Sequence, residues 1–178
     1  FVTFLRGWIS ATVLLTPSYG ATCFKQKFLK DGFPNGPEFQ KRKPRWEQAL
    51  PVALVSSLEA EGYNETTPRP SCPTLKEGEA LSPLTHERSI SPWRYRIDTD
   101  ENRYPKKLAF AECLCRGCIS TRTGQETAAL SSVRLHQSLL VVKRKPCSTD
   151  GSNKTDGFQF RRENIRVPVG CTCIKKQK

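Results

Sequence analysis

Cysteine is the residue type in this sequence whose spacing points most directly to chemistry. The chain of 178 residues contains eight cysteines. Two of them, Cys23 and Cys72, lie in the N-terminal half, and the other six share one C-terminal stretch. Those six are Cys113, Cys115, Cys118, Cys147, Cys171 and Cys173. Clustered thiols either bind a metal ion or form a framework of disulfides, and the cellular compartment decides between the two.

The N-terminal segment has the features of a secretory signal peptide. Arg6 precedes an apolar run at residues 8–15, and small residues around Gly20 suit a signal peptidase. We therefore predict that residues 1–20 are a partial signal peptide that lacks its initiator Met, and that cleavage occurs near Gly20 or Ala21. A short buried strand is the alternative, since the run is too short to span a bilayer.

Two acceptor sites for N-linked glycosylation, Asn64 and Asn153, support the same compartment. Each Asn is followed by a residue other than Pro and then by Thr, in a polar stretch rich in turn residues. A single sequon often arises by chance, so an unmodified surface Asn is the alternative at each site. Together with the leader and the cysteines, the two sequons favour a secreted, extracellular protein whose thiols are oxidised.

Other kinds of chemistry find little support. His86 and His136 are the only imidazoles, and neither a Gly-rich phosphate loop nor a nucleophile elbow is present, so neither catalysis nor a cofactor is expected. A zinc site built from the clustered cysteines would be lost when these cysteines oxidise. The net charge of +12 would suit nucleic acid, but the leader and the cysteines keep the chain apart from it. No membrane insertion is expected either.

Residues 21–88 predict a loop-rich N-terminal extension with one short helix. Leu50, Leu54 and Leu58 recur every four residues, and Pro51 is tolerated only in a first helical turn. The helix should therefore begin near Leu50 and end before Gly62. We expect its apolar face to pack against its own domain, with a dedicated partner helix as the alternative.

Residues 89–178 predict an all-β domain, because the hydrophobic period changes from four to two. Trp93, Tyr95 and Ile97 alternate with the polar Arg94, Arg96 and Asp98, which predicts a half-buried strand with a basic outer face. Further strands are predicted at residues 107–115, 132–145 and about 165–173. Pro168 indicates an edge or a bulge in the last strand. The predicted fold is an elongated antiparallel β ribbon.

The spacing of the last two cysteines constrains the disulfides. Cys171 and Cys173 would lie on one face of a strand about 7 Å apart, where they bridge poorly to each other. We therefore predict the pairs Cys113 with Cys171 and Cys118 with Cys173. Each pair closes a loop of more than fifty residues, worth on the order of 4 kcal/mol in the chain-entropy model. Such links suit a chain of which only 37% is hydrophobic.

Six short motifs carry a resemblance to a known family. They are Ser91-Pro92-Trp93, Arg103-Tyr104-Pro105, Ala111-Glu112-Cys113, Gly117-Cys118-Ile119, Ser132-Val133 and Val169-Gly170-Cys171-Thr172-Cys173. In order and spacing, the segment from about residue 89 to 174, roughly half of the chain, resembles the interleukin-17 cytokine family.

The resemblance implies a cystine-knot-like fold with two of the three knot disulfides, formed by the two pairs already predicted from spacing. It also implies a disulfide-linked homodimer. Cys72 and Cys147 match two family positions that pair with each other, often between subunits. Cys23 and Cys115 depart from the family pattern and are left as a further candidate pair.

The resemblance also implies a secreted pro-inflammatory cytokine that acts in epithelial defence. Its expected partners are ectodomains of the interleukin-17 receptor family, the E chain together with the shared A chain. Trp93 and Tyr95 would then be receptor contacts, with a place in the core as the alternative. Another disulfide-knotted growth factor or antagonist, retained on glycosaminoglycans, is the alternative.

Charge is concentrated in the domain that carries the resemblance. Residues 89–178 have a net charge of +10, against +2 for residues 1–88. A field of this kind favours encounter with acidic receptor surfaces or retention on heparan sulfate, and solubility alone is the alternative explanation.

Overall fold

The computed structural model describes residues 22–25, 29–30, 33–34, 46–62, 71–75, 84–148 and 155–176. The predicted signal peptide at residues 1–20 and the sequons at Asn64 and Asn153 lie outside these residues. None of the helices in the described part of the chain is both long and apolar enough to span a bilayer.

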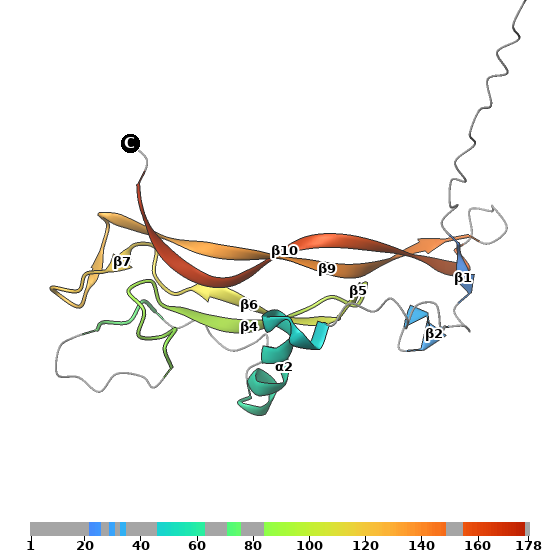
Figure 1. Ribbon diagram of the computed structural model, residues 1–178, viewed down its shortest axis with the longest axis horizontal. Coiled ribbons are helices and arrows are strands. Elements are labelled where there is room, and N and C mark those ends of the chain that lie inside the picture. Colours follow the sequence, from blue (N-terminus) through green and yellow to red (C-terminus); the bar gives the residue numbers. More distant parts are fainter. Residues whose placement is uncertain are drawn as a thin grey trace, which may run out of the picture.

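A long antiparallel hairpin runs through the whole molecule (Figure 1). Strands β9 (Leu130–Cys147) and β10 (Gly157–Lys175) pair along their entire length. At ~3.3 Å per residue, the 19 residues of β10 span roughly 60 Å, which gives the elongated ribbon predicted from the sequence. The register shifts between Pro168 and Gly170, where the proline predicted a bulge or an edge.

Short strands extend this sheet at its sides. Strand β1 (Phe24–Lys25) pairs with β10, and β5 (Arg103–Tyr104) pairs with β9. Two small separate sheets are formed by β2 (Leu29–Lys30) with β3 (Phe33–Pro34), and by β7 (Cys118–Ile119) with β8 (Glu126–Thr127).

A second layer lies along one side of the hairpin. Strands β4 (Trp93–Thr99) and β6 (Lys107–Cys113) form a two-stranded antiparallel sheet. The helix α2 (Leu50–Ala60), preceded by the short 3-10 helix η2 (Trp46–Gln48), packs on this sheet on the side away from the hairpin (Figure 1). The predicted start of the helix near Leu50 is confirmed, and Pro51 stands in its first turn.

Two hydrophobic clusters hold the layers together. The larger joins the second layer to the hairpin through Leu108, Val141 and Val167, and Trp46 closes it with an Nε1–H that donates to the carbonyl oxygen of Leu140 at 2.6 Å. In the smaller cluster, Leu58 of α2 packs against β4 and β6; its other buried members are Ile97 and Ala109. The helix therefore packs against its own domain, as predicted.

One buried charge fixes the turn between β4 and β6. The Arg103 side chain is only 4% exposed, and its Nη1 lies 2.9 Å from Asp98 Oδ2. The guanidinium also donates to three backbone carbonyl oxygens, those of Asp98, Pro105 and Lys106. Because these partners satisfy the buried cation, this turn keeps a single shape between the two strands.

Candidate functional site

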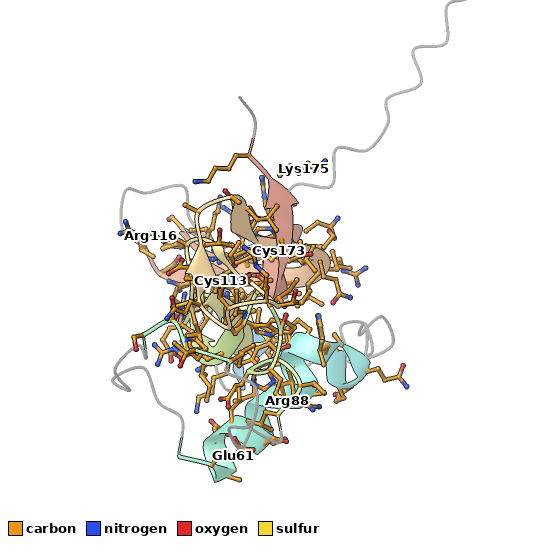
Figure 2. The ribbon with its side chains drawn as sticks, turned by 90° about the vertical axis from the view of Figure 1, so that its left-hand side faces the viewer. Glu61, Arg88, Cys113, Arg116, Cys173 and Lys175 are labelled. Carbon is orange, nitrogen blue, oxygen red and sulfur yellow. A yellow bond between two sulfur atoms is a disulfide. The ribbon has the colours of Figure 1, made fainter. Side chains whose placement is uncertain are left out.

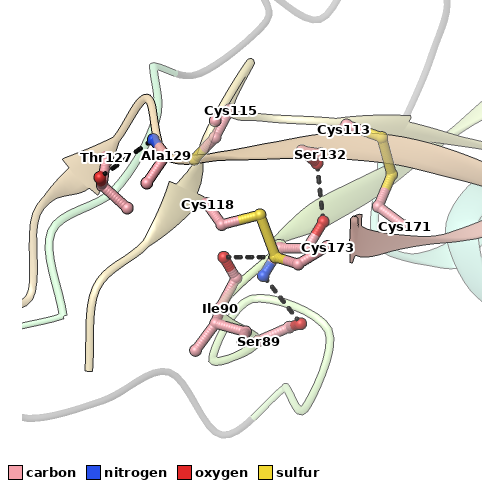
Figure 3. The surroundings of a disulfide bond; sticks show 12 residues. Ser89, Ile90, Cys113, Cys115, Cys118, Thr127, Ala129, Ser132, Cys171 and Cys173 are labelled. Carbon is pink, nitrogen blue, oxygen red and sulfur yellow. Dashed lines mark hydrogen bonds between the residues drawn. A yellow bond between two sulfur atoms is a disulfide. The ribbon is translucent and has the colours of Figure 1, made fainter. Parts of the chain in front are cut away.

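Two disulfides join the second layer to the end of the hairpin. Cys113, the last residue of β6, is bonded to Cys171 with a Cα–Cα distance of 5.8 Å. Cys118, the first residue of β7, is bonded to Cys173 with a Cα–Cα distance of 6.1 Å. Figure 3 shows the two bonds on neighbouring parts of β10. These are the pairs that the strand spacing predicted.

The remaining four cysteines pair differently from the expectation. Cys72 is bonded to Cys115, and Cys23 is bonded to Cys147, so the links Cys72–Cys147 and Cys23–Cys115 are not those of the structure. Within one chain, the reason is the distance between the two ends of the hairpin. Cys147 stands opposite Gly157, fourteen residues before Cys171 on β10, which places it roughly 45 Å from the end that holds Cys115.

All eight cysteines lie in described residues, and none of them is free. Each end of the hairpin therefore has its own covalent links. Cys23–Cys147 fastens β1 beside the end of the hairpin where β9 leads into β10, while the three other bonds gather at the opposite, open end. In this structure both Cys72 and Cys147 have their partners within the same chain.

Polar contacts seat the segment before β4 against this disulfide cluster (Figure 3). The hydroxyl oxygens of Ser91 and Ser132 lie 2.6 Å apart, and Ser91 is 1% exposed. The carbonyl oxygen of Ile90 accepts a hydrogen bond from the backbone N–H of Ile119 at 2.7 Å and lies 3.7 Å from the Sγ of Cys173. The loop that precedes Trp93 is thus held in place by β7, β9 and β10.

The aromatic residues of β4 pack mainly within the chain. Tyr95 Oη donates to the carbonyl oxygen of Val169 at 2.9 Å, and the indole of Trp93 lies against Gly170, where an added Cβ would come within 3.3 Å of the ring. The His86 imidazole centroid lies 5.8 Å from that of Trp93 and 5.4 Å from that of Tyr95. Trp93 and Tyr95 are half-buried, so they form a core edge that still reaches the surface.

Positive charge is distributed unevenly between the two layers. On β4, Arg94 and Arg96 are both paired with Glu112, at 3.3 and 3.0 Å. The hairpin strands β9 and β10 instead carry eight Lys or Arg residues and a single acid, Glu163. Lys143 and Arg161 even stand directly opposite each other in the register. The basic surface predicted from the charge count is therefore mainly the hairpin.

These features define a class of protein: an antiparallel β ribbon with a disulfide frame of the cystine-knot type. A family model described as Interleukin-17 matches residues 89–175. The chain is 55% identical to interleukin-17C of Mus musculus, over 96% of this chain and 95% of that protein. It is 64% identical to interleukin-17C of Homo sapiens, over 78% of this chain and 73% of that protein. Human interleukin-17D is 36% identical over 64% of this chain and 54% of its own length.

The chain belongs to the interleukin-17 family of cytokines. Members of this family are secreted and non-enzymatic. This family membership decides against the alternative class that the sequence left open, another disulfide-knotted growth factor or antagonist. The six motifs thus predicted the family correctly, and the family model covers nearly the same residues.

Sequence reasoning missed the position of His86. The residue lies in a stretch without periodicity, seven residues before Trp93, and nothing in that pattern indicates that its ring packs beside two aromatics. Burial lowers the pKa of His86 below the ordinary 6.5, and the nearby carboxylates of Glu87 and Glu61 oppose this effect. The neutral imidazole is therefore the form that the folded state favours.

This lowered pKa predicts a loss of stability in mild acid. Because the folded state binds its proton more weakly than the unfolded chain, the contribution of His86 is present above the ordinary pKa and decreases as the pH falls through it. We expect the free energy of unfolding to decrease between pH ~7.5 and pH ~5.5, and to decrease less in His86→Gln. Denaturant unfolding with the disulfides intact measures both.

A matched control is His136→Gln, because His136 is exposed on β9. This variant should keep the pH profile of the wild type. If the free energy of unfolding decreased equally at acidic pH in the wild type and in His86→Gln, His86 would have no part in this decrease.

Proposed function

We propose that this protein is a secreted pro-inflammatory cytokine that acts as a homodimer, binds interleukin-17 receptor E and A chains and assembles them in epithelial defence. The observation that carries this proposal is the 55% identity with mouse interleukin-17C along 96% of the chain. Family membership supports binding to receptors of the interleukin-17 receptor family, and the particular chains follow from the sequence resemblance.

The surface near the disulfide cluster supports an interface there. Ile90, Leu135 and Ile174 are 43%, 48% and 47% exposed, and all three belong to segments close to the Cys118–Cys173 bond. Exposed apolar side chains on a rigid, cross-linked frame favour protein binding, because little conformational freedom is lost when the partner arrives.

Receptor binding is tested with the oxidised, purified protein and immobilised receptor ectodomains. We expect saturable binding to the E chain, further binding of the A chain to that complex, and no binding to an unrelated cytokine receptor. The same protein after reduction and alkylation should lose binding, because the four disulfides hold its binding surface together. If the correctly oxidised protein failed to bind the E chain, the receptor assignment would be wrong.

The homodimer is tested separately. Because all eight cysteines are paired within the chain, the dimer that we propose is held by packing, and a disulfide-linked dimer would require exchange of one of these bonds. Light scattering in solution should give about twice the chain mass of 20.1 kDa, and a non-reducing denaturing gel should show the single chain. A monomer in solution would contradict the proposal. A band of double mass that thiol collapses would instead support the covalent form.

Retention on heparan sulfate is a second function that the hairpin supports. β9 and β10 carry eight basic residues and one acid. Lys143 is paired with Asp100, whereas Lys145 and Arg161 are exposed and contribute positive charge to the surface of the hairpin. A linear sulfated chain can follow such a surface, and its binding should weaken with salt.

This second function predicts tight, salt-sensitive binding to a heparin column. Replacing the exposed Lys145 and Arg161 by Gln should lower the salt concentration needed for elution. Replacing the exposed Arg88 and Arg116, which lie outside the hairpin, removes the same charge and serves as the control. Equal shifts for the two pairs would mean that net charge alone, and no hairpin site, binds heparin.

A further inference from the structure

A concave apolar site lies between α2 and the segments packed on it. We call it the helix groove, a cavity of about 260 Å³. Its apolar lining consists of Leu50, Leu54 and Leu58 from α2, Leu84 from the start of the described segment 84–148, and Tyr95 from β4. Of the leucines that the sequence predicted as the packing face of the helix, Leu58 enters the core and Leu54 packs beside it. Leu50 remains exposed at the rim, and all three line the groove.

The rim of the groove exposes apolar side chains to solvent. Leu50 is 46% exposed and Leu84 is 40% exposed, whereas Leu58 at the base is only 7% exposed. The volume lies below the roughly 300–1,000 Å³ of most small-molecule sites, so it suits one or two side chains of a peptide better than a free metabolite.

The acid that lines the groove is Glu61, on a chain with a net charge of +12. The segments 46–62 and 84–90 contain four Glu and one Arg, and one of these acids, Glu59, is paired with Lys107 of β6. Figure 2, which looks along the long axis, shows Glu61 on the lower side of the molecule, with Arg88 nearer to it than Arg116 or Lys175. A cation of a partner that binds here can therefore pair with Glu61, although the chain as a whole is basic.

The acids of the groove also stand at the wrong end of their helix. α2 has no basic residue in its last turn, where Glu59 lies, and Glu61 is its C-cap. Negative side chains at the C-terminal end of a helix are unfavourable, because the carbonyl groups there already carry partial negative charge. The Nζ of Lys107 lies 2.5 Å from Oε1 of Glu59 and compensates the negative charge of that side chain. Within the described residues, the carboxylate of Glu61 has no such cation, although it lines the groove.

We propose that the helix groove binds a peptide segment of a partner protein in which a leucine-sized apolar side chain is flanked by Lys or Arg. The apolar side chain fills the space between Leu54 and Tyr95 and covers the exposed Leu50 and Leu84. The flanking cation pairs with Glu61 and compensates the C-terminal end of α2. This site is separate from the exposed apolar residues at the disulfide cluster.

The test uses the oxidised, full-length, isotope-labelled protein and two capped hexapeptides. One has the sequence Gly-Lys-Leu-Leu-Arg-Gly, and the other, with reversed charge, is Gly-Glu-Leu-Leu-Asp-Gly. Amide chemical shifts followed by NMR should show saturable changes in α2 and around His86 and Tyr95 with the basic peptide only. Because the whole chain is strongly positive, non-specific attraction would favour the acidic peptide instead.

Variants at the rim test the groove without disturbing the core. Glu61→Lys should weaken binding of the basic peptide about threefold, the size of a surface ion pair. Leu50→Ser combined with Leu84→Ser should weaken it about tenfold through lost apolar contact. The matched control is Glu163→Lys, which makes the same change of charge at an exposed position of the hairpin. This control should bind as the wild type does.

Three results would overturn the proposal. The first is equal binding of the two peptides, which would show that charge plays no part. The second is wild-type affinity in both groove variants while their unfolding curves remain normal. The third is movement of the groove signals with protein concentration in the absence of peptide, which would make a second copy of this chain the occupant.

Discussion

The architecture depends on the covalent link between the second layer and the hairpin. A two-stranded hairpin is at best marginally stable in water, because it buries too little apolar surface. The Cys113–Cys171 bond holds β6 against β10, and the space enclosed between them is filled by Leu108, Val141 and Val167. Helix α2 in turn packs on β6. Without that bond, neither the larger core nor the platform beneath the helix would be defined.

Much of this fold could be predicted from the sequence, because one face of each main strand is buried. The alternation from Trp93 to Ile97 and the apolar run at 139–142 identified β4 and β9, and the close spacing of Cys171 and Cys173 excluded a bond between them. The hairpin strands proved longer than predicted. The added stretch at residues 161–164 of β10 is polar and pairs through backbone hydrogen bonds, which leave no hydrophobic pattern.

The N-terminal cysteines and the helix groove could not be predicted in the same way. Cys23 and Cys72 lie in segments without periodicity. Their disulfide partners are set by the path of the folded chain, which no local sequence pattern indicates. The groove combines side chains from α2, β4 and the segment around His86, which meet only after folding. Its acids are nevertheless visible in the sequence as a local conflict, since Glu59 and Glu61 stand at the end of the helix that disfavours them.

The disulfides also give the chain a particular covalent topology. The bond from Cys23 to Cys147 closes a ring by joining residues 124 positions apart, and the bonds from Cys113 to Cys171 and from Cys118 to Cys173 overlap that ring and extend it. Any single backbone cut between Cys23 and Cys173 therefore leaves both pieces joined. An extracellular protease could open a loop of this protein without releasing a fragment, so cleavage would change its shape before it changed its mass.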